Sequence, residues 1–146
     1  MTKVARILLV SEKPPFSAEV VAEAARLAGE LQGRVSILQL MKIWGSGLGL
    51  PHPALRPNRQ EQQAAWAAVL EAEAELRRLG VHVTGKNAIG TRKPAKVILR
   101  EAARLGSDVI VMADKPGGPV RNFLLANEPR QVARRAHARV HLVGRS

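Results

Sequence analysis

Residues 108–136 read DVIVMADKPGGPVRNFLLANEPRQVARRA, and this stretch decides the fold. It begins with a short, β-branched apolar run at 109–112, which predicts a fully buried strand. The KPGGP at 115–119 predicts a loop, because proline and glycine interrupt helices and central strands. The Asn-Glu-Pro at 127–129 predicts the first turn of a helix, since Asn caps it, Glu suits its positive end and Pro is tolerated there. A strand, a loop and a helix N-terminus in this order form the place where an open parallel α/β sheet binds a ligand.

The chain before and after this stretch repeats the alternation of strand and helix. Apolar runs predict further strands at 4–11, 34–41, 81–89 and 139–143. Helical spacing of apolar residues, with capping residues at the ends, predicts helices between 17 and 33, over 60–79, over 94–105 and over 128–137. This alternation indicates an α/β fold: an open, doubly wound, parallel five-stranded sheet with helices on both faces, Rossmann-like, in a single domain spanning 1–146.

The helix predicted over 60–79 is rich in Ala, Glu and Gln. Its apolar spacing predicts that the core-facing residues are Trp66, Val69, Leu70 and Leu76. The Gly- and Pro-rich residues 44–58 before it lack periodicity and predict a long connection, which is either functional or mobile.

The composition excludes several classes of protein. Of the 146 residues, 46% are hydrophobic and 24% are charged, as in a folded globular domain. There is no cysteine, which excludes disulfides, Cys-ligated metal sites and thiol catalysis. The N-terminus lacks a signal-peptide pattern, and no apolar run approaches the ~20 residues of a membrane span. We therefore expect a cytoplasmic protein that does not associate with membranes.

The net charge of +11 attracts anions in general without selecting one partner. Lys96, Arg100 and Arg104 recur along one stripe of the helix predicted over 94–105. Further cations precede this stripe or lie on the last predicted helix, at Arg92, Lys93, Arg130, Arg134 and Arg135. Two interpretations stay open: weak binding of a polyanion such as nucleic acid, or the solvated face of an amphipathic helix. The absence of interleaved aromatic residues argues against a stacking platform for single strands.

Five stretches in this order resemble the universal stress protein family over nearly the whole chain: RILLVS (6–11), SAEVVAEAARLAGELQGRVSILQL (17–40), ELRRLGVHV (75–83), PAKVILREAARLGSDVIVMADK (94–115) and FLLANEPRQVARRAHARVHLV (123–143). The resemblance implies the strand order 3-2-1-4-5. It also implies a homodimer formed partly through the fifth strand, with Val140, His141 and Leu142. For one large branch of the family it implies ATP bound at the carboxyl ends of strands 1 and 4.

The residues that the resemblance assigns to the nucleotide depart from that branch. Its Asp after strand 1 is Glu12 here, and its adenine-facing backbone position on strand 2 falls near Leu40. The three glycines of its phosphate loop read Ala113, Pro116 and Ala126, and the hydroxyl residue that follows reads Asn127. With the neighbours of this loop, the candidate cofactor-binding residues are Glu12, Leu40, Met112, Ala113, Lys115, Gly117, Gly118, Ala126 and Asn127.

The loss of the glycines predicts a degenerate cleft. Glycine lets the backbone approach a phosphate closely, whereas Pro116 fixes φ and has no N–H to donate. Glu128 places a negative charge, and Pro129 removes a donor, where the predicted helix would face the anion. Gly117 and Gly118 offer partial compensation beside cationic side chains, or PGGP is simply a tight surface turn.

The sequence thus favours a non-catalytic binding or signalling module of the stress response, without a bound cofactor. Two alternatives remain: a member that binds ATP or AMP with magnesium and hydrolyses it weakly, and a nonspecific polyanion binder.

No metal-ligand spacing is found among the histidines at 52, 82, 137 and 141, so no metal site is predicted. Two carboxylates near the predicted ligand site, Glu12 and Asp114, are compatible with magnesium binding or acid–base catalysis. Alternatively, Asp114 caps its loop and Glu12 pairs with Lys13 or Lys115.

Overall fold

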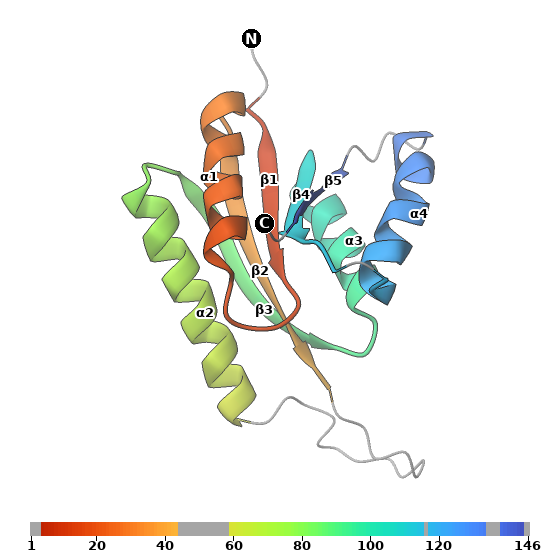
Figure 1. Cartoon of the computed structure of the whole chain (residues 1–146), viewed down its shortest axis with the longest axis horizontal. Helices are drawn as coiled ribbons and strands as arrows, with labels where there is room; N and C mark the ends of the chain where they lie inside the picture. Colours follow the sequence, from red (N-terminus) through yellow and green to blue (C-terminus); the bar gives the residue numbers. More distant parts are fainter. Residues whose placement is uncertain (1–3, 44–58, 116, 134–137, 145–146) are drawn as a thin grey trace.

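The computed structural model describes residues 4–43, 59–115, 117–133 and 138–144, and side chains in these ranges except 127–133 (Figure 1). Five strands alternate with four helices: β1 Arg6–Ser11, α1 Ala18–Leu31, β2 Arg34–Lys42, α2 Arg59–Arg78, β3 Val83–Thr91, α3 Pro94–Leu105, β4 Val109–Ala113, α4 Pro119–Ala133 and β5 Arg139–Val143. The strands form one parallel sheet in the order β3-β2-β1-β4-β5. The predicted α/β class, parallel pairing and strand order are confirmed.

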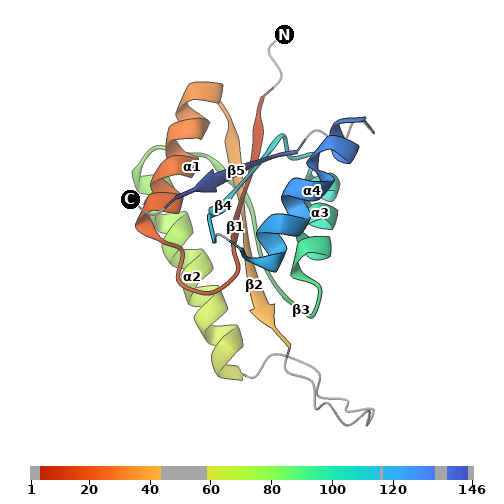
Figure 2. The same cartoon turned by 45° about the vertical axis from the view of Figure 1, so that its right-hand side comes forward.

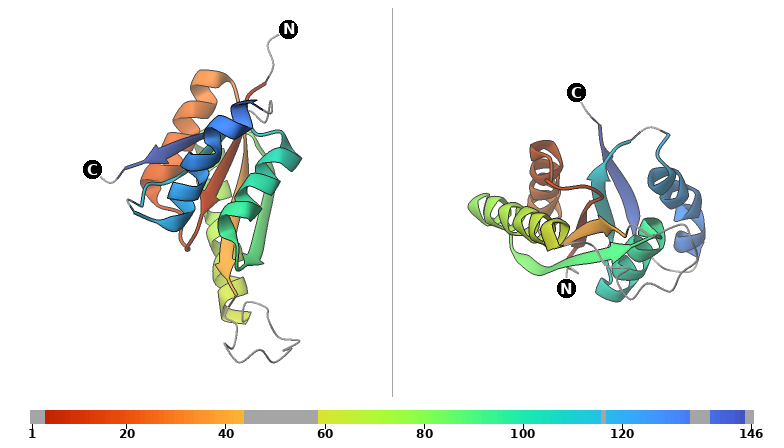
Figure 3. Two further views of the ribbon diagram at one scale, coloured as in Figure 1. Left: turned by 90° about the vertical axis from the view of Figure 1, so that its right-hand side faces the viewer. Right: turned by 90° about the horizontal axis from the view of Figure 1, so that it is seen from below.

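The sheet lies between two layers of helices (Figure 3, right). On the central strand β1, Ile7 and Leu9 pack with α1 and α2, in what we call the α1/α2 core. Leu8 and Val10 point the other way and pack with α3 and α4, in the α3/α4 core. Because alternate side chains of a strand point to opposite faces, a strand covered on both faces reads as a continuous apolar run, as β1 does.

The fourth helix begins at Pro119, so the prediction that it opens near Glu128 was wrong. Val120 and Leu124 are 6% and 0% exposed and belong to the α3/α4 core. Their burial at a spacing of one helical turn stabilises helix where the sequence predicted loop. Pro119 fits the first helical position, since the N–H that it lacks would have no partner there.

The core-facing side of α2 also differs from the prediction. Val69 and Leu76 are buried as expected, but Trp66 and Leu70 are 42% and 51% exposed. The remaining buried residues of the helix are alanines, at 65, 68 and 72. Alanine leaves room for the helix backbone to approach the sheet closely, so the bulky side chains are directed to solvent.

Candidate functional site

The carboxyl edge of the sheet brings the ends of β1, β2 and β4 together. Ser11 is paired with Gln39, and Leu9 with Val111, so Ser11 and Ala113 end their strands at the same level. From β1 the chain proceeds to β2 on one side, and β4 lies on the other. Such a reversal of strand order is where open α/β sheets bind ligands in the crevice beyond the strand ends.

The loop after β4 is a closed turn. The N–H of Gly118 donates to the carbonyl oxygen of Lys115 at 2.8 Å, and Gly117 has φ +77. A hydrogen bond between residues three apart, with positive φ at the residue before the donor, is typical of a β-turn with glycine at its third position. A Cβ on Gly118 would lie 3.0 Å from that same carbonyl oxygen, so the closeness of the turn favours glycine there. The Gly118 N–H is therefore engaged within the loop instead of facing a phosphate.

The cation in the first turn of α4 is also engaged. Arg121 Nε donates to Asp114 Oδ1 at 2.5 Å, and Arg121 Nη1 donates to Asn122 Oδ1 at 3.1 Å. Asp114 is fixed as well by its backbone, whose N–H donates to the carbonyl oxygen of Val143 at 2.9 Å. The Asp114 carboxylate thus neutralises a guanidinium from the first turn of α4. An arriving anion would have to compete with this carboxylate for Arg121.

Glu12 does not take part in that pair. Within the described part of the chain it forms no ion pair, so the predicted pairing with Lys13 or Lys115 is not found there. Lys115 is exposed. Glu12 and Lys115 are thus titratable groups at this edge of the sheet that remain available to a ligand.

The backbone of Leu40, which the family resemblance assigns to adenine, is hydrogen-bonded by a side chain of its own strand. Gln39 is 0% exposed, and its Nε2 donates to the carbonyl oxygens of Leu40 at 2.9 Å and Ser11 at 3.1 Å. The Leu40 carbonyl therefore already accepts one hydrogen bond. Gln39 Oε1 is buried without a partner among the described residues, so a ligand would reach this acceptor only after the side chain moves. The sequence prediction missed Gln39; a lone Gln in an otherwise apolar strand was the available signal.

The remaining candidate residues divide into three groups. Met112 is 1% exposed and lies in the α3/α4 core, whereas Ala113, Lys115, Gly117 and Gly118 gather at the end of β4. Ala126 and Asn127 lie within α4, seven and eight residues after its start, which is roughly 10–12 Å along the helix axis. The structure therefore does not place these two residues at the helix N-terminus that follows the loop.

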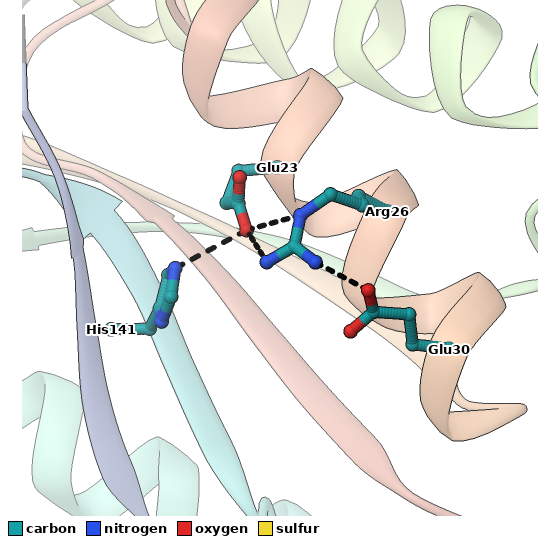
Figure 4. A network of polar contacts seen from close by, with 4 residues as sticks. All are labelled: Glu23, Arg26, Glu30 and His141. Carbon is teal, nitrogen blue, oxygen red and sulfur yellow. Dashed lines mark hydrogen bonds and ion pairs between the residues drawn. The ribbon is translucent and has the colours of Figure 1, made fainter.

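A polar cluster outside this edge joins α1 to β5 (Figure 4). Glu23 bonds Arg26 within the helix and lies 3.3 Å from Nε2 of His141 on β5, while Arg26 also pairs with Glu30 at 2.6 Å. The hydrogen bond from Arg26 lowers the pKa of Glu23 below its ordinary value of 4.5, and the neighbouring His141 acts in the same direction. The spacing of three and four residues along a helix predicts the pairs of Arg26 with Glu23 and Glu30. The contact with His141 joins residues far apart in the chain, and no sequence pattern predicts it.

We expect Glu23→Gln to destabilise the protein by about 0.2–1 kcal/mol near neutral pH, as for partly exposed ion pairs. The lowered pKa means that the ionised carboxylate stabilises the fold above pH 4.5 and that this contribution is lost as the pH falls through the folded-state pKa. Urea unfolding of both proteins from pH 7 down to acid should therefore show a difference that shrinks. Glu71→Gln, an exposed position on α2, is the matched control. A difference that grows in acid would contradict this account.

The family model described as "Universal stress protein family" matches residues 3–144. The chain belongs to the universal stress protein family. No curated protein sequence matches it.

Solved structures of universal stress proteins share the fold at low sequence identity. One from Burkholderia pseudomallei has a TM-score of 0.69 at 18% identity, covering 95% of each chain. One from Archaeoglobus fulgidus in complex with dAMP has a TM-score of 0.65 at 16% identity, covering 99% of this chain and 98% of the other. A third, in complex with cAMP, has a TM-score of 0.63 at 17% identity, covering 98% of each.

None of the helices in the described part of the chain has the length and hydropathy required to cross a bilayer. No three His, Asp or Glu side chains gather in a metal-binding arrangement among the same residues.

Proposed function

We propose that this universal stress protein is a non-catalytic binding module of the stress response whose adenine-nucleotide cleft is degenerate and does not hold a triphosphate. The observation that carries the proposal is the closed turn after β4, in which Gly118 donates its N–H to Lys115 at 2.8 Å. A triphosphate needs several backbone N–H groups directed outward, because each phosphate oxygen is costly to desolvate without a donor.

The electrostatics of the turn support the same proposal. The Asp114 carboxylate lies at the start of α4, where a phosphate would be placed by the positive end of the helix. It carries the same charge as the phosphate and holds the Arg121 guanidinium at 2.5 Å. Pro119 contributes no N–H to the first turn of that helix. The Gly118 N–H and the Arg121 guanidinium are thus bonded within the protein, and Pro119 lacks the donor that its position could supply.

The main alternative retains a nucleotide, with or without slow hydrolysis and magnesium. Relatives of the same fold have been solved with dAMP, cAMP and AMP. A monophosphate needs fewer backbone donors than a triphosphate, and Glu12, Lys115 and the unpaired Gln39 Oε1 would be its polar partners. The two proposals therefore differ in whether binding is measurable and whether it depends on these side chains.

Isothermal titration calorimetry with ATP and with AMP, each with magnesium, separates the proposals. We expect no binding of ATP at micromolar concentration. Micromolar ATP binding that is weakened by Glu12→Ala or Lys115→Ala would establish the alternative. Binding of AMP alone would leave the triphosphate proposal standing and assign a monophosphate to the cleft.

We also propose a homodimer formed partly through β5. This strand is one edge of the sheet, and Val140, His141 and Leu142 are each only half-buried (Figure 2). An edge strand with exposed apolar side chains tends to pair with another chain unless it is protected.

Leu142→Arg is expected to lower self-association, because it brings a charge into the apolar part of that edge. Sedimentation velocity over a range of concentrations measures the change in the monomer–dimer equilibrium. Val4→Arg introduces the same charge at a position 42% exposed outside β5 and serves as the control. A wild-type chain that stays monomeric at every concentration would end the dimer proposal.

A further inference from the structure

A row of cations runs along the outward side of α3, and we call it the α3 ridge: Arg92, Lys93, Lys96, Arg100 and Arg104. All five side chains are exposed, while Val97, Ile98 and Ala102 on the opposite side of the helix are buried against the sheet. The positions from 96 to 104 recur every four residues, so neighbouring charges are separated by about 6 Å along the helix. The ridge lies on the face of the molecule covered by α3 and α4 (Figure 3, left).

The charges of the ridge are mostly not neutralised. Arg92, Lys93, Lys96 and Arg100 form no ion pair with any residue in the described ranges, and only Arg104 is paired, with Glu101 at 2.6 Å. On the other face of the sheet each of four cations is held by a glutamate, at 2.6, 3.2, 2.5 and 3.0 Å for Arg26, Arg77, Arg78 and Lys86. Four charges of the ridge are thus unpaired, whereas these four cations on the other face of the sheet are neutralised.

The local structure strengthens the positive potential at one end of the ridge. The first turn of α3 contains no acidic residue, so the partial positive charge of the helix N-terminus adds to that of Lys93 and Lys96. Thr91 Oγ1 accepts a hydrogen bond from the N–H of Lys93 at 2.8 Å and fixes the backbone entering the helix. Four unpaired like charges repel one another and destabilise the free protein slightly, whereas an anion along the ridge would relieve this repulsion.

We propose that the α3 ridge binds the phosphate backbone of double-stranded nucleic acid without reading its sequence. A row of exposed Lys and Arg in which only Arg104 is paired with a glutamate is suited to a linear polyanion. The ridge has no aromatic residue, which disfavours single strands, since these bind by stacking their bases. The exposed large apolar side chains of the described chain lie elsewhere, at Val4, Leu31, Trp66, Leu70, Leu79 and Phe123, so the ridge has nothing to insert into a membrane surface. This inference is independent of the nucleotide cleft.

The salt dependence of duplex binding tests the proposal. Four phosphate contacts predict a slope of about −3.6 in log K against log salt, so the affinity should fall roughly a hundredfold between about 50 and 200 mM. Fluorescence anisotropy with a labelled DNA duplex of arbitrary sequence measures it on the intact protein. Lys96→Gln with Arg100→Gln should halve the slope, leaving about a tenfold fall over the same range.

Arg77→Gln with Arg78→Gln removes the same two charges from the opposite face and is the matched control. It should leave the slope close to that of the wild type, and far-UV circular dichroism verifies that both variants are folded. Three results would overturn the proposal: no duplex binding at about 50 mM salt, an equal change of slope in the control, or equally tight binding of phosphatidylserine vesicles or poly-glutamate. The last result would assign the ridge to a lipid surface or an acidic protein.

Discussion

Replacing Leu9 by alanine should lower the free energy of unfolding by about 2–5 kcal/mol. Leu9 is 0% exposed and lies on β1, the strand at the centre of the sheet, with β2 and β4 as its neighbours. Its side chain packs in the α1/α2 core. The surrounding strands are hydrogen-bonded on both sides and cannot move inward to fill the space, so the loss includes a cavity as well as the transfer of buried methyl groups.

Leu70→Ala is the matched control for this prediction. It is the same chemical change at a side chain that is 51% exposed, and a surface substitution of this kind changes stability by about 0.5 kcal/mol or less. Urea unfolding followed by circular dichroism measures both variants, with an unchanged m-value showing that the unfolded states are comparable. If Leu70→Ala proves as costly as Leu9→Ala, the outward placement of α2's bulky side chains is wrong.

The strands could be predicted from the sequence because their signal is local. Each central strand is covered on both faces, and a continuous run of apolar residues at 7–10 or 109–113 is the direct consequence of that burial. The start of α4 could not be predicted in the same way. Local signals indicated a loop at 115–119 and the cap of a helix at Asn127, whereas the burial of Val120 and Leu124 against the sheet determines where the helix begins.

The sequence predicts where a site would lie, but not whether it can hold a ligand. The predicted strand order, which the structure confirms, brings the ends of β1 and β4 and the loop after β4 to one edge of the sheet. Whether the loop offers its donors depends on pairs that only the folded chain creates, such as Asp114 with Arg121 and Gly118 with Lys115. The contact between Gln39 and the Leu40 carbonyl likewise depends on a side-chain conformation that no spacing rule fixes.

The double variant Pro116→Gly with Asp114→Asn should bind ATP on the order of a hundredfold more tightly than the wild type. The first change restores a backbone donor, and the second frees a cation. Glycine at position 116 supplies an N–H and loosens the Lys115–Gly118 turn, while asparagine at 114 releases Arg121 from its ion pair. A hydrogen bond to a charged group contributes about 1.5–3 kcal/mol, and each 1.4 kcal/mol corresponds to about a tenfold change in the dissociation constant. Two such interactions give the expected size of the effect.

Calorimetric titration of ATP into the wild type, the two single variants and the double variant measures this gain and its additivity. Pro94→Gly, the same change in the first turn of α3, controls for added flexibility and should leave the ATP affinity unchanged. Each single variant should raise the ATP affinity by a factor that is roughly the square root of the double variant's factor. This holds because the amide and the guanidinium act on the phosphates separately. A folded double variant with the affinity of the wild type would mean that neither the turn nor the Asp114–Arg121 pair limits triphosphate binding. The proposed loss of triphosphate binding would then have to originate at Glu12 and the ends of β1 and β2.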